Sequence, residues 1–141
     1  RGRLRLSILR APGIYAGDRL PVERLTRGLP ALAHAEDVYT NHIHAVDLAR
    51  LCLAALSRGA GGRVFHATDD SDLKMGDYFD LAADLCALPR PPRISREQAR
   101  ASLSPMLLSF MSESRRLDNR RLKRELRLVL KYPTVNEGLV A

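Results

Sequence analysis

The segment spanning residues 44–57 constrains the fold most, because it is apolar around nearly its whole circumference. Its apolar side chains recur at helical spacing and widen into a broad face: Val46, Leu48, Ala49, Leu51, Cys52, Leu53 and Leu56. A surface helix keeps one polar side towards water, whereas a helix that is apolar on most sides is covered by other structure. We therefore predict a helix here that is buried on more than one side.

Short extended segments lie before and after this helix. Residues 3–8 alternate between polar and apolar side chains, which predicts a strand that ends at Pro12-Gly13. Residues 38–43 are rich in β-branched and aromatic residues, and residues 63–67 follow a glycine cluster, so both are expected to be extended. We expect residues 14–19 to form a loop.

A second long helix is predicted over residues 75–86, where apolar residues again recur at helical spacing. Ser95 and Gln98 form a capping-box pattern, and short helices are expected over residues 21–26, after Ser104-Pro105, over 120–126 and around 135–139. The aromatic residues and methionines of these segments are expected to pack in the core: Met75, Tyr78, Phe79, Met106, Phe110 and Met111. The order of elements is α/β in character. Two or three short strands cannot form a sheet with covered edges, so we expect other structure to complete it.

The charge balance raises the question of anion binding. The formal net charge is +7, and the excess of arginine gathers at the first residues and between residues 115 and 127. No aromatic residues alternate with the latter run, which favours a solvated face over a nucleic-acid site. No apolar run approaches the roughly 20 residues that span a bilayer. Cys52 and Cys86 fit no metal or redox motif and are expected to be buried thiols in a reducing cytoplasm.

Four stretches, in order, carry a resemblance to a known family. They are LRAPGIYAG at residues 9–17, NHIHAVDLA at 41–49, VFHATDD at 64–70, and SESRRLDNRRL at 112–122 followed by Tyr132-Pro133 and Glu137-Gly138-Leu139. Together they cover nearly the whole chain. They resemble the extended and atypical short-chain dehydrogenase/reductases, the NAD-dependent epimerase/dehydratases.

The resemblance implies that residues 1–141 form the C-terminal, substrate-side portion of a Rossmann-type NAD(P)-binding fold, with its last strands and a small helical lobe. It implies NAD or NADP as the cofactor of the intact protein and a sugar-like or other small substrate. The family's dinucleotide-binding half would be absent. Because of the exposed sheet edges we expect this chain to bind that missing half or to associate with itself, and we expect neither nucleic acid nor a membrane as a partner.

The chain lacks the family's catalytic motifs. No G-x-x-G-x-x-G occurs, and Tyr15, Tyr39 and Tyr78 are followed four residues later by Arg19, Ile43 and Ala82, so none supplies Tyr-x-x-x-Lys. In the family that lysine lowers the pKa of the tyrosine, which exchanges a proton with the substrate. We therefore expect no catalysis by this chain alone. The alternative is a non-catalytic binding or scaffold domain, with anions or nucleic acid as its candidate ligands.

The resemblance places Pro12, Gly13, Ile14 and Tyr15 beside the nicotinamide, where their backbone can bond the carboxamide. Proline removes a donor there and glycine permits a close approach of the backbone. The alternative is an ordinary turn that ends a strand.

Three residues are candidates for substrate binding. Arg19 either binds an anionic group or is a solvated surface arginine. By resemblance, Asn41 and His44 lie at the floor of the substrate cleft; alternatively, Asn41 satisfies local backbone groups and His44 caps the following helix. A metal site from His42, His44 and Asp47 is conceivable from their spacing, but the family uses no metal and we expect none.

Overall fold

Parallel pairs of short strands organise the computed structural model, which describes residues 2–140. Strand β1 (Ser7–Arg10) pairs with β6 (Arg63–His66), and β2 (Gly13–Tyr15) pairs with β5 (His42–His44). Helix α2 (Ala45–Arg58) follows β5 directly and packs against β1, β2 and β5. Helix α2 connects β5, which belongs to one of these pairs, to β6, which belongs to the other.

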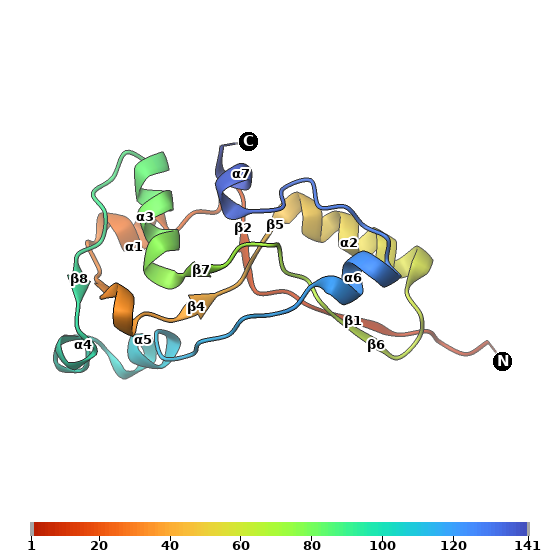
Figure 1. Ribbon diagram of the computed structural model, residues 1–141, viewed down its shortest axis with the longest axis horizontal. Coiled ribbons are helices and arrows are strands. Elements are labelled where there is room, and N and C mark those ends of the chain that lie inside the picture. The colour runs from red at the N-terminus through yellow and green to blue at the C-terminus, as the bar shows by residue number, and fades with distance from the viewer. Residues whose placement is uncertain (1, 141) are drawn as a thin grey trace.

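Two further strand pairs belong to the other end of the molecule (Figure 1). Strand β3 (Ala31–Leu32) pairs in parallel with β8 (Arg93–Ile94), and β4 (Tyr39–Thr40) pairs antiparallel with β7 (Leu73–Lys74). Most of the helices gather around them: α1 (Val22–Thr26), the 3-10 turn η1 (His34–Glu36), α3 (Met75–Leu85), α4 (Arg96–Ser102) and α5 (Pro105–Phe110). This end is the small helical lobe that the sequence predicts.

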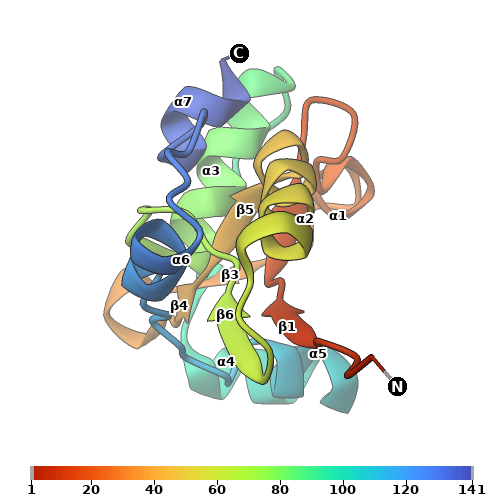
Figure 2. The same ribbon diagram turned by 90° about the vertical axis from the view of Figure 1, so that its right-hand side faces the viewer.

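The last part of the chain runs back along the molecule. Helix α6 (Arg120–Glu125) packs against β6, and α7 (Val135–Leu139) packs against α3 and β5. Figure 2 shows α2 and α6 on either side of β6. The C-terminal segment therefore joins the strand-rich end to the helical lobe.

Two apolar clusters fill these two ends. One lies under α2 and α6 and includes Ile43, Leu51, Phe65, Leu122 and Leu126, each with an exposed fraction of 0%. The other fills the helical lobe with the following buried residues: Tyr15, Leu25, Ala31, Leu32, Val38, Met75, Tyr78, Phe79, Ala82, Ala83, Ala99, Met111, Val135 and Leu139. Burial of these side chains is the main favourable contribution to folding.

The structure confirms the α/β fold and both long helices, and the Ser95–Gln98 capping box forms in both directions. The expected loop at residues 14–19 is wrong in its first part, because Gly13–Tyr15 is a strand paired with β5. Strands β7 and β8 have two residues each, which leaves no periodic pattern to detect.

Four expectations of burial are wrong. Met106 and Phe110 are 81% and 62% exposed, and Cys52 is exposed, while Met75, Tyr78, Phe79 and Met111 are buried as predicted. Helix α2 is covered on one side only, since Leu53 and Leu56 are 67% and 81% exposed. The sequence pattern reports that these faces are apolar, whereas the described residues supply nothing that packs on them.

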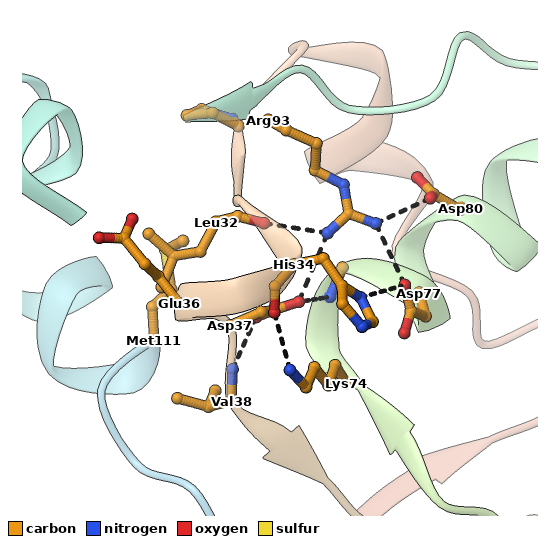
Figure 3. Close-up of polar contacts among 12 residues, drawn as sticks. Leu32, His34, Glu36, Asp37, Val38, Lys74, Asp77, Asp80, Arg93 and Met111 are labelled. Carbon is orange, nitrogen blue, oxygen red and sulfur yellow. Dashed lines mark hydrogen bonds and ion pairs between the residues drawn. The ribbon is translucent and has the colours of Figure 1, made fainter. Parts of the chain in front are cut away.

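An arginine at the centre of the helical lobe links β3, β8 and α3 (Figure 3). The Arg93 guanidinium donates to the Leu32 carbonyl at 3.0 Å and to the Asp80 carboxylate at 2.8 Å, and it lies 3.4 Å from Asp37 and from Asp77. Asp37 in turn accepts hydrogen bonds from the backbone N–H of Val38 and of Gly76, both at 2.8 Å. A carboxylate on free N–H groups of the first helical turn stabilises the start of a helix. Arg93 therefore neutralises the carboxylates that hold α3 in place.

We expect Arg93→Met to lower the free energy of unfolding by about 2 kcal/mol, because it leaves the 2% exposed Asp37 side chain and the half-buried Asp80 without their counter-charge. Urea unfolding measures the change. The matched control is Arg90→Met, because Arg90 pairs with Asp84 at the surface and both side chains are at least half exposed. Such pairs contribute little, so an equal loss in the two variants would contradict a central role for Arg93.

Candidate functional site

The pairing of β2 with β5 brings the two predicted site segments side by side. Gly13 lies opposite His42, Ile14 opposite Ile43 and Tyr15 opposite His44. The Gly13 N–H also donates to the carbonyl of Asn41 at 3.1 Å. Segments that are almost thirty positions apart in the sequence therefore form one strand-end region.

Tyr15 is a core residue, with an exposed fraction of 0%. Its phenol donates a hydrogen bond to the carbonyl of Thr134 at 3.3 Å, and its ring meets the His44 ring edge-on at 5.2 Å. Burial, together with the nearby Asp69 and Asp47 charges, raises the pKa of Tyr15 above its usual value. A Cβ at Gly138 would overlap the phenol, so glycine is required there. In this segment Pro12, Gly13 and Ile14 remain at least partly accessible.

Asn41 uses its side-chain amide to hold a distant part of the chain. The Nδ2 group donates to the Arg115 carbonyl at 2.8 Å, and the Oδ1 atom accepts from the Leu117 N–H at 2.9 Å. Its bonds are therefore to backbone groups, as the alternative reading holds, but these groups lie on a distant segment. The segment at residues 114–117 lies beside β4, because the Arg115 N–H donates to the Tyr39 carbonyl at 3.2 Å.

His44 caps α2. Its Nδ1 atom accepts a hydrogen bond from the Val46 N–H at 3.1 Å, and its ring packs on Tyr132 with 4.1 Å between ring centroids. Burial lowers the pKa of His44, with Lys131 acting in the same direction and Asp47 against it. These contacts favour the capping role for this residue.

Arg19 is exposed in the turn between β2 and α1, and its backbone N–H closes that turn on Ala16 at 3.0 Å. Its position agrees with a solvated surface arginine. Within residues 2–140 there is also no group of three or more histidine, cysteine, aspartate or glutamate side chains that suits a metal ion.

His42 is a buried polar side chain of this region. It is 5% exposed, and its ring stacks on Tyr78 with 4.1 Å between centroids and 23° between planes. Burial lowers the pKa of His42 to about 4, so the ring is neutral at pH 7. Its Nε2 atom lies 2.9 Å from the Thr40 hydroxyl, whereas its Nδ1 atom has no partner among the described residues.

A cavity of about 280 Å³ opens between β2, α1, α3 and α5 and includes His42 in its wall. Its lining is Gly13, Ile14, Pro21, Arg24, Thr40, His42, Met75, Tyr78, Phe79 and Phe110. Sequence analysis assigned Gly13 and Ile14 to a site, but it read Met75, Tyr78, Phe79 and Phe110 as core and did not single out Arg24 or Thr40. No local signal marks these residues, because they come together only through the tertiary fold.

Asp69 lies directly behind His42. Its N–H donates to the His42 carbonyl at 2.8 Å, and its Oδ1 atom accepts from the Ser71 N–H at 2.9 Å. The Oδ2 atom is buried and has no partner within residues 2–140. Burial raises the pKa of Asp69 from 3.8 to about 7, against the hydrogen bonds from Ser71. This carboxyl group can therefore change its protonation state near neutral pH.

A basic groove of about 800 Å³ lies at the opposite end of the molecule, between β6 and α6. It is lined by Arg63, His66, Asp118, Arg120, Arg121, Arg124 and Glu125. Arg63 pairs with Glu125 and Arg120 with Asp118, while Arg121 donates to the Val64 carbonyl at 3.0 Å. Much of the positive charge in this groove is thus already paired or bonded.

Comparison with known proteins identifies the fold. No protein-family model matches the chain, and a search of curated proteins finds no significant match. A solved structure of a functionally unknown conserved protein from Silicibacter pomeroyi is similar at 34% identity with a TM-score of 0.81, over 95% of this chain and 46% of that one. A nucleoside-diphosphate-sugar epimerase from Pseudomonas aeruginosa matches at 23% identity and a TM-score of 0.75, over 97% and 46% of the two chains.

The human epimerase family protein SDR39U1, solved with NADPH, is similar at 14% identity and a TM-score of 0.73, over 96% of this chain and 47% of that one. The chain has the fold of the C-terminal portion of the NAD-dependent epimerase/dehydratases. The resemblance drawn from the four sequence motifs is thereby confirmed. The chain spans less than half the length of each of these three solved structures.

Asp69 predicts how stability depends on pH. Its folded pKa is higher than its unfolded pKa, so the folded state keeps a proton that the unfolded state loses, and stability falls as pH rises from about 4 to about 7. We expect Asp69→Asn to remove this fall and to be more stable than the parent at pH 8, on the order of 2 kcal/mol. Urea unfolding at pH 5 and pH 8 measures it. Asp72→Asn, at an exposed neighbouring carboxylate, is the control; identical pH profiles for parent and Asp69→Asn would refute the assignment.

Proposed function

We propose that this chain is the substrate-side portion of an NAD(P)-dependent oxidoreductase or epimerase that acts on a sugar-like or other small substrate. The observation that carries the proposal is the pairing of β2 with β5, where Gly13 and Ile14 line a cavity together with Thr40 and His42. In epimerase/dehydratases, by resemblance, the first of these segments lies beside the nicotinamide and the second at the substrate. The bound NADPH of SDR39U1 and the substrate class of the Pseudomonas epimerase support this assignment.

Gly13 and Ile14 fit a flat cofactor ring better than they fit the rest of a dinucleotide. Gly13 is exposed and has no side chain, so a ring can approach its backbone closely. The sequence has no G-x-x-G-x-x-G motif for a pyrophosphate, and its glycine cluster at residues 59–62 leads from a helix to a strand, not from a strand to a helix. The cofactor, when bound, supplies hydride transfer; residues 12–14 orient the ring, Tyr15 supports them from the core, and Asn41 and His44 fix the strand ends that carry the substrate site. Arg19 is the candidate for an anionic group of the substrate.

The dinucleotide-binding half of the enzyme is proposed to cover the apolar side of α2 and the free edge of β1. The exposed side of α2 carries an apolar stripe, formed by Val46, Ala49, Cys52, Leu53 and Leu56. Next to it, Leu4, Leu6 and Ile8 are 92%, 61% and 47% exposed, and β1 pairs with β6 along one edge only. Contiguous apolar surface of this kind marks an interface, and an unpaired strand edge invites another strand.

Nucleotide binding tests the proposed function. We expect calorimetric titration of this chain with NAD+, NADP+ and their reduced forms to give no saturable heat, because the pyrophosphate site belongs to the other half. The same titration should show binding once the nucleotide-binding half is supplied, in one polypeptide or as a second chain. Micromolar binding by this chain alone would show that it builds its own nucleotide site, and no binding by the two halves together would sink the proposal.

Self-association tests the proposed interface. Without the other half, we expect this chain to form dimers or larger species through α2 and β1, visible by light scattering or sedimentation. Leu53→Glu with Leu56→Glu should shift it to a monomer, because two charges then lie in the apolar stripe. Met106→Gln is the control, since Met106 is 81% exposed but lies on α5. A monodisperse parent monomer would contradict the prediction.

The basic groove supports a second candidate, a non-catalytic domain that binds anions. Its arginines are mostly paired, and the predicted absence of nucleic-acid binding stays a prediction. The nucleotide titration distinguishes the two proposed functions.

Among residues 2–140, no helix is both long and apolar enough to cross a bilayer. A cytoplasmic location also stays a prediction; both cysteines are free.

A further inference from the structure

Arg24 is a half-buried arginine that pairs with no carboxylate in the described part of the chain. Its Nη2 group donates to the Pro30 carbonyl at 2.8 Å and lies 3.9 Å from the Met111 sulfur, and neither acceptor is charged. Arg93 differs, because three carboxylates surround it. Burial lowers the pKa of Arg24, with no neighbouring acid acting against it. An arginine stays charged in proteins, so the charge of Arg24 is left uncompensated.

This charge lies in the wall of the cavity that the proposed function gives to the cofactor ring. Arg24 lines the cavity of about 280 Å³ together with Gly13 and Ile14. None of the lining residues within residues 2–140 is acidic, and His42 is neutral at pH 7 because burial lowers its pKa to about 4. A compact space of this volume is about 8 Å across, a distance at which two unit charges interact appreciably when water is partly excluded. A charge on the bound ring is therefore within reach of Arg24.

Stacking on an aromatic side chain holds the Arg24 charge in place. The guanidinium carbon lies 4.6 Å from the centroid of the Phe79 ring. It occupies one face of a ring that would otherwise attract a cation. One face of Tyr78 is likewise covered, by the His42 ring at 4.1 Å between centroids. The aromatic wall thus offers less attraction to a positively charged ligand, while Arg24 repels it.

We propose that Arg24 shifts the binding preference of this cavity towards the reduced nicotinamide ring. The oxidised ring carries a positive charge and the reduced ring is neutral, so the Arg24 charge opposes the binding of the oxidised form only. Charge beside the ring is one of the means by which a protein tunes its cofactor. Tighter relative binding of the reduced form raises the midpoint potential of the bound couple. This inference rests on the proposed function, because it adds a redox preference to the same site.

Calorimetric titrations of this chain combined with the nucleotide-binding half test the inference, with NAD+, NADH, NADP+ and NADPH as ligands. Arg24→Met keeps an unbranched side chain over Phe79 and removes the charge. It should lower the ratio of the dissociation constants, oxidised over reduced, on the order of tenfold, mostly through tighter binding of the oxidised form. For a two-electron couple this tenfold change lowers the midpoint potential by about 30 mV. A smaller folded fraction weakens both forms equally, so it cancels in the ratio.

Three further variants separate charge from packing. Arg24→Gln also removes the charge but can still donate to the Pro30 carbonyl, and it should repeat the result of Arg24→Met. Arg24→Lys keeps the charge and should change the ratio less than either. Arg27→Met removes an exposed charge at the end of the same helix, outside the cavity lining, and should leave both dissociation constants unchanged.

Three results would overturn the inference: an unchanged ratio in Arg24→Met and Arg24→Gln, a change in Arg24→Lys as large as theirs, or the same change in Arg27→Met. In each of these cases the nucleotide still binds, so the proposed function stands without the redox preference. If no nucleotide binds to the two halves together, the proposed function fails and this inference fails with it.

Discussion

The hydrogen bonds to the buried carboxylate of Asp47 fix how the C-terminal segment packs against the β2–β5 pair. Asp47 lies in the first turn of α2 with an exposed fraction of 0%, and it accepts hydrogen bonds from the backbone N–H groups of Lys131 and Tyr132 at 2.9 and 2.8 Å and from Arg50 at 2.8 Å. A buried carboxylate is tolerated only when such donors surround it. By meeting this requirement, Asp47 fixes the last segment of the chain against the start of α2.

The neighbouring contacts follow from that attachment. Tyr132 packs on the His44 ring, and the Thr134 carbonyl receives the Tyr15 phenol at 3.3 Å. The C-terminal segment thus closes behind the β2–β5 pair and converts Tyr15 into a core residue. Gly13, Ile14 and His42 of the same two strands line the cavity instead. The buried Asp47 carboxylate therefore holds the C-terminal segment against His44 and Tyr15.

The sequence predicted the elements better than it predicted their surroundings. The two long helices were predicted from the local spacing of apolar residues, and the Ser95 cap from the local pattern of Ser95 and Gln98. Strands β7 and β8 were not predicted, because a segment of two residues shows no periodic pattern. They are strands only because they pair with β4 and β3. The exposure of Leu53, Met106 and Phe110 was not predicted either. A hydrophobic side chain favours burial, but the sequence does not say whether other residues pack against it. The cavity wall draws on residues 13 to 110, and no window of sequence contains that arrangement.

The buried polar groups of the chain differ in whether their hydrogen-bonding atoms have partners. Asp47 has a donor for each oxygen, which is the arrangement expected of a structural carboxylate. Asp69 and His42 each keep one buried atom without a partner among residues 2–140, and the two residues are joined directly, by the Asp69 N–H and the His42 carbonyl at 2.8 Å. His42 is the first residue of β5, and Asp69 follows the end of β6, so the two groups lie where the end of β6 meets the start of β5. Unsatisfied buried groups weaken a fold, so Asp69 and His42 are expected to lower stability, whereas the fully bonded Asp47 carboxylate supports it.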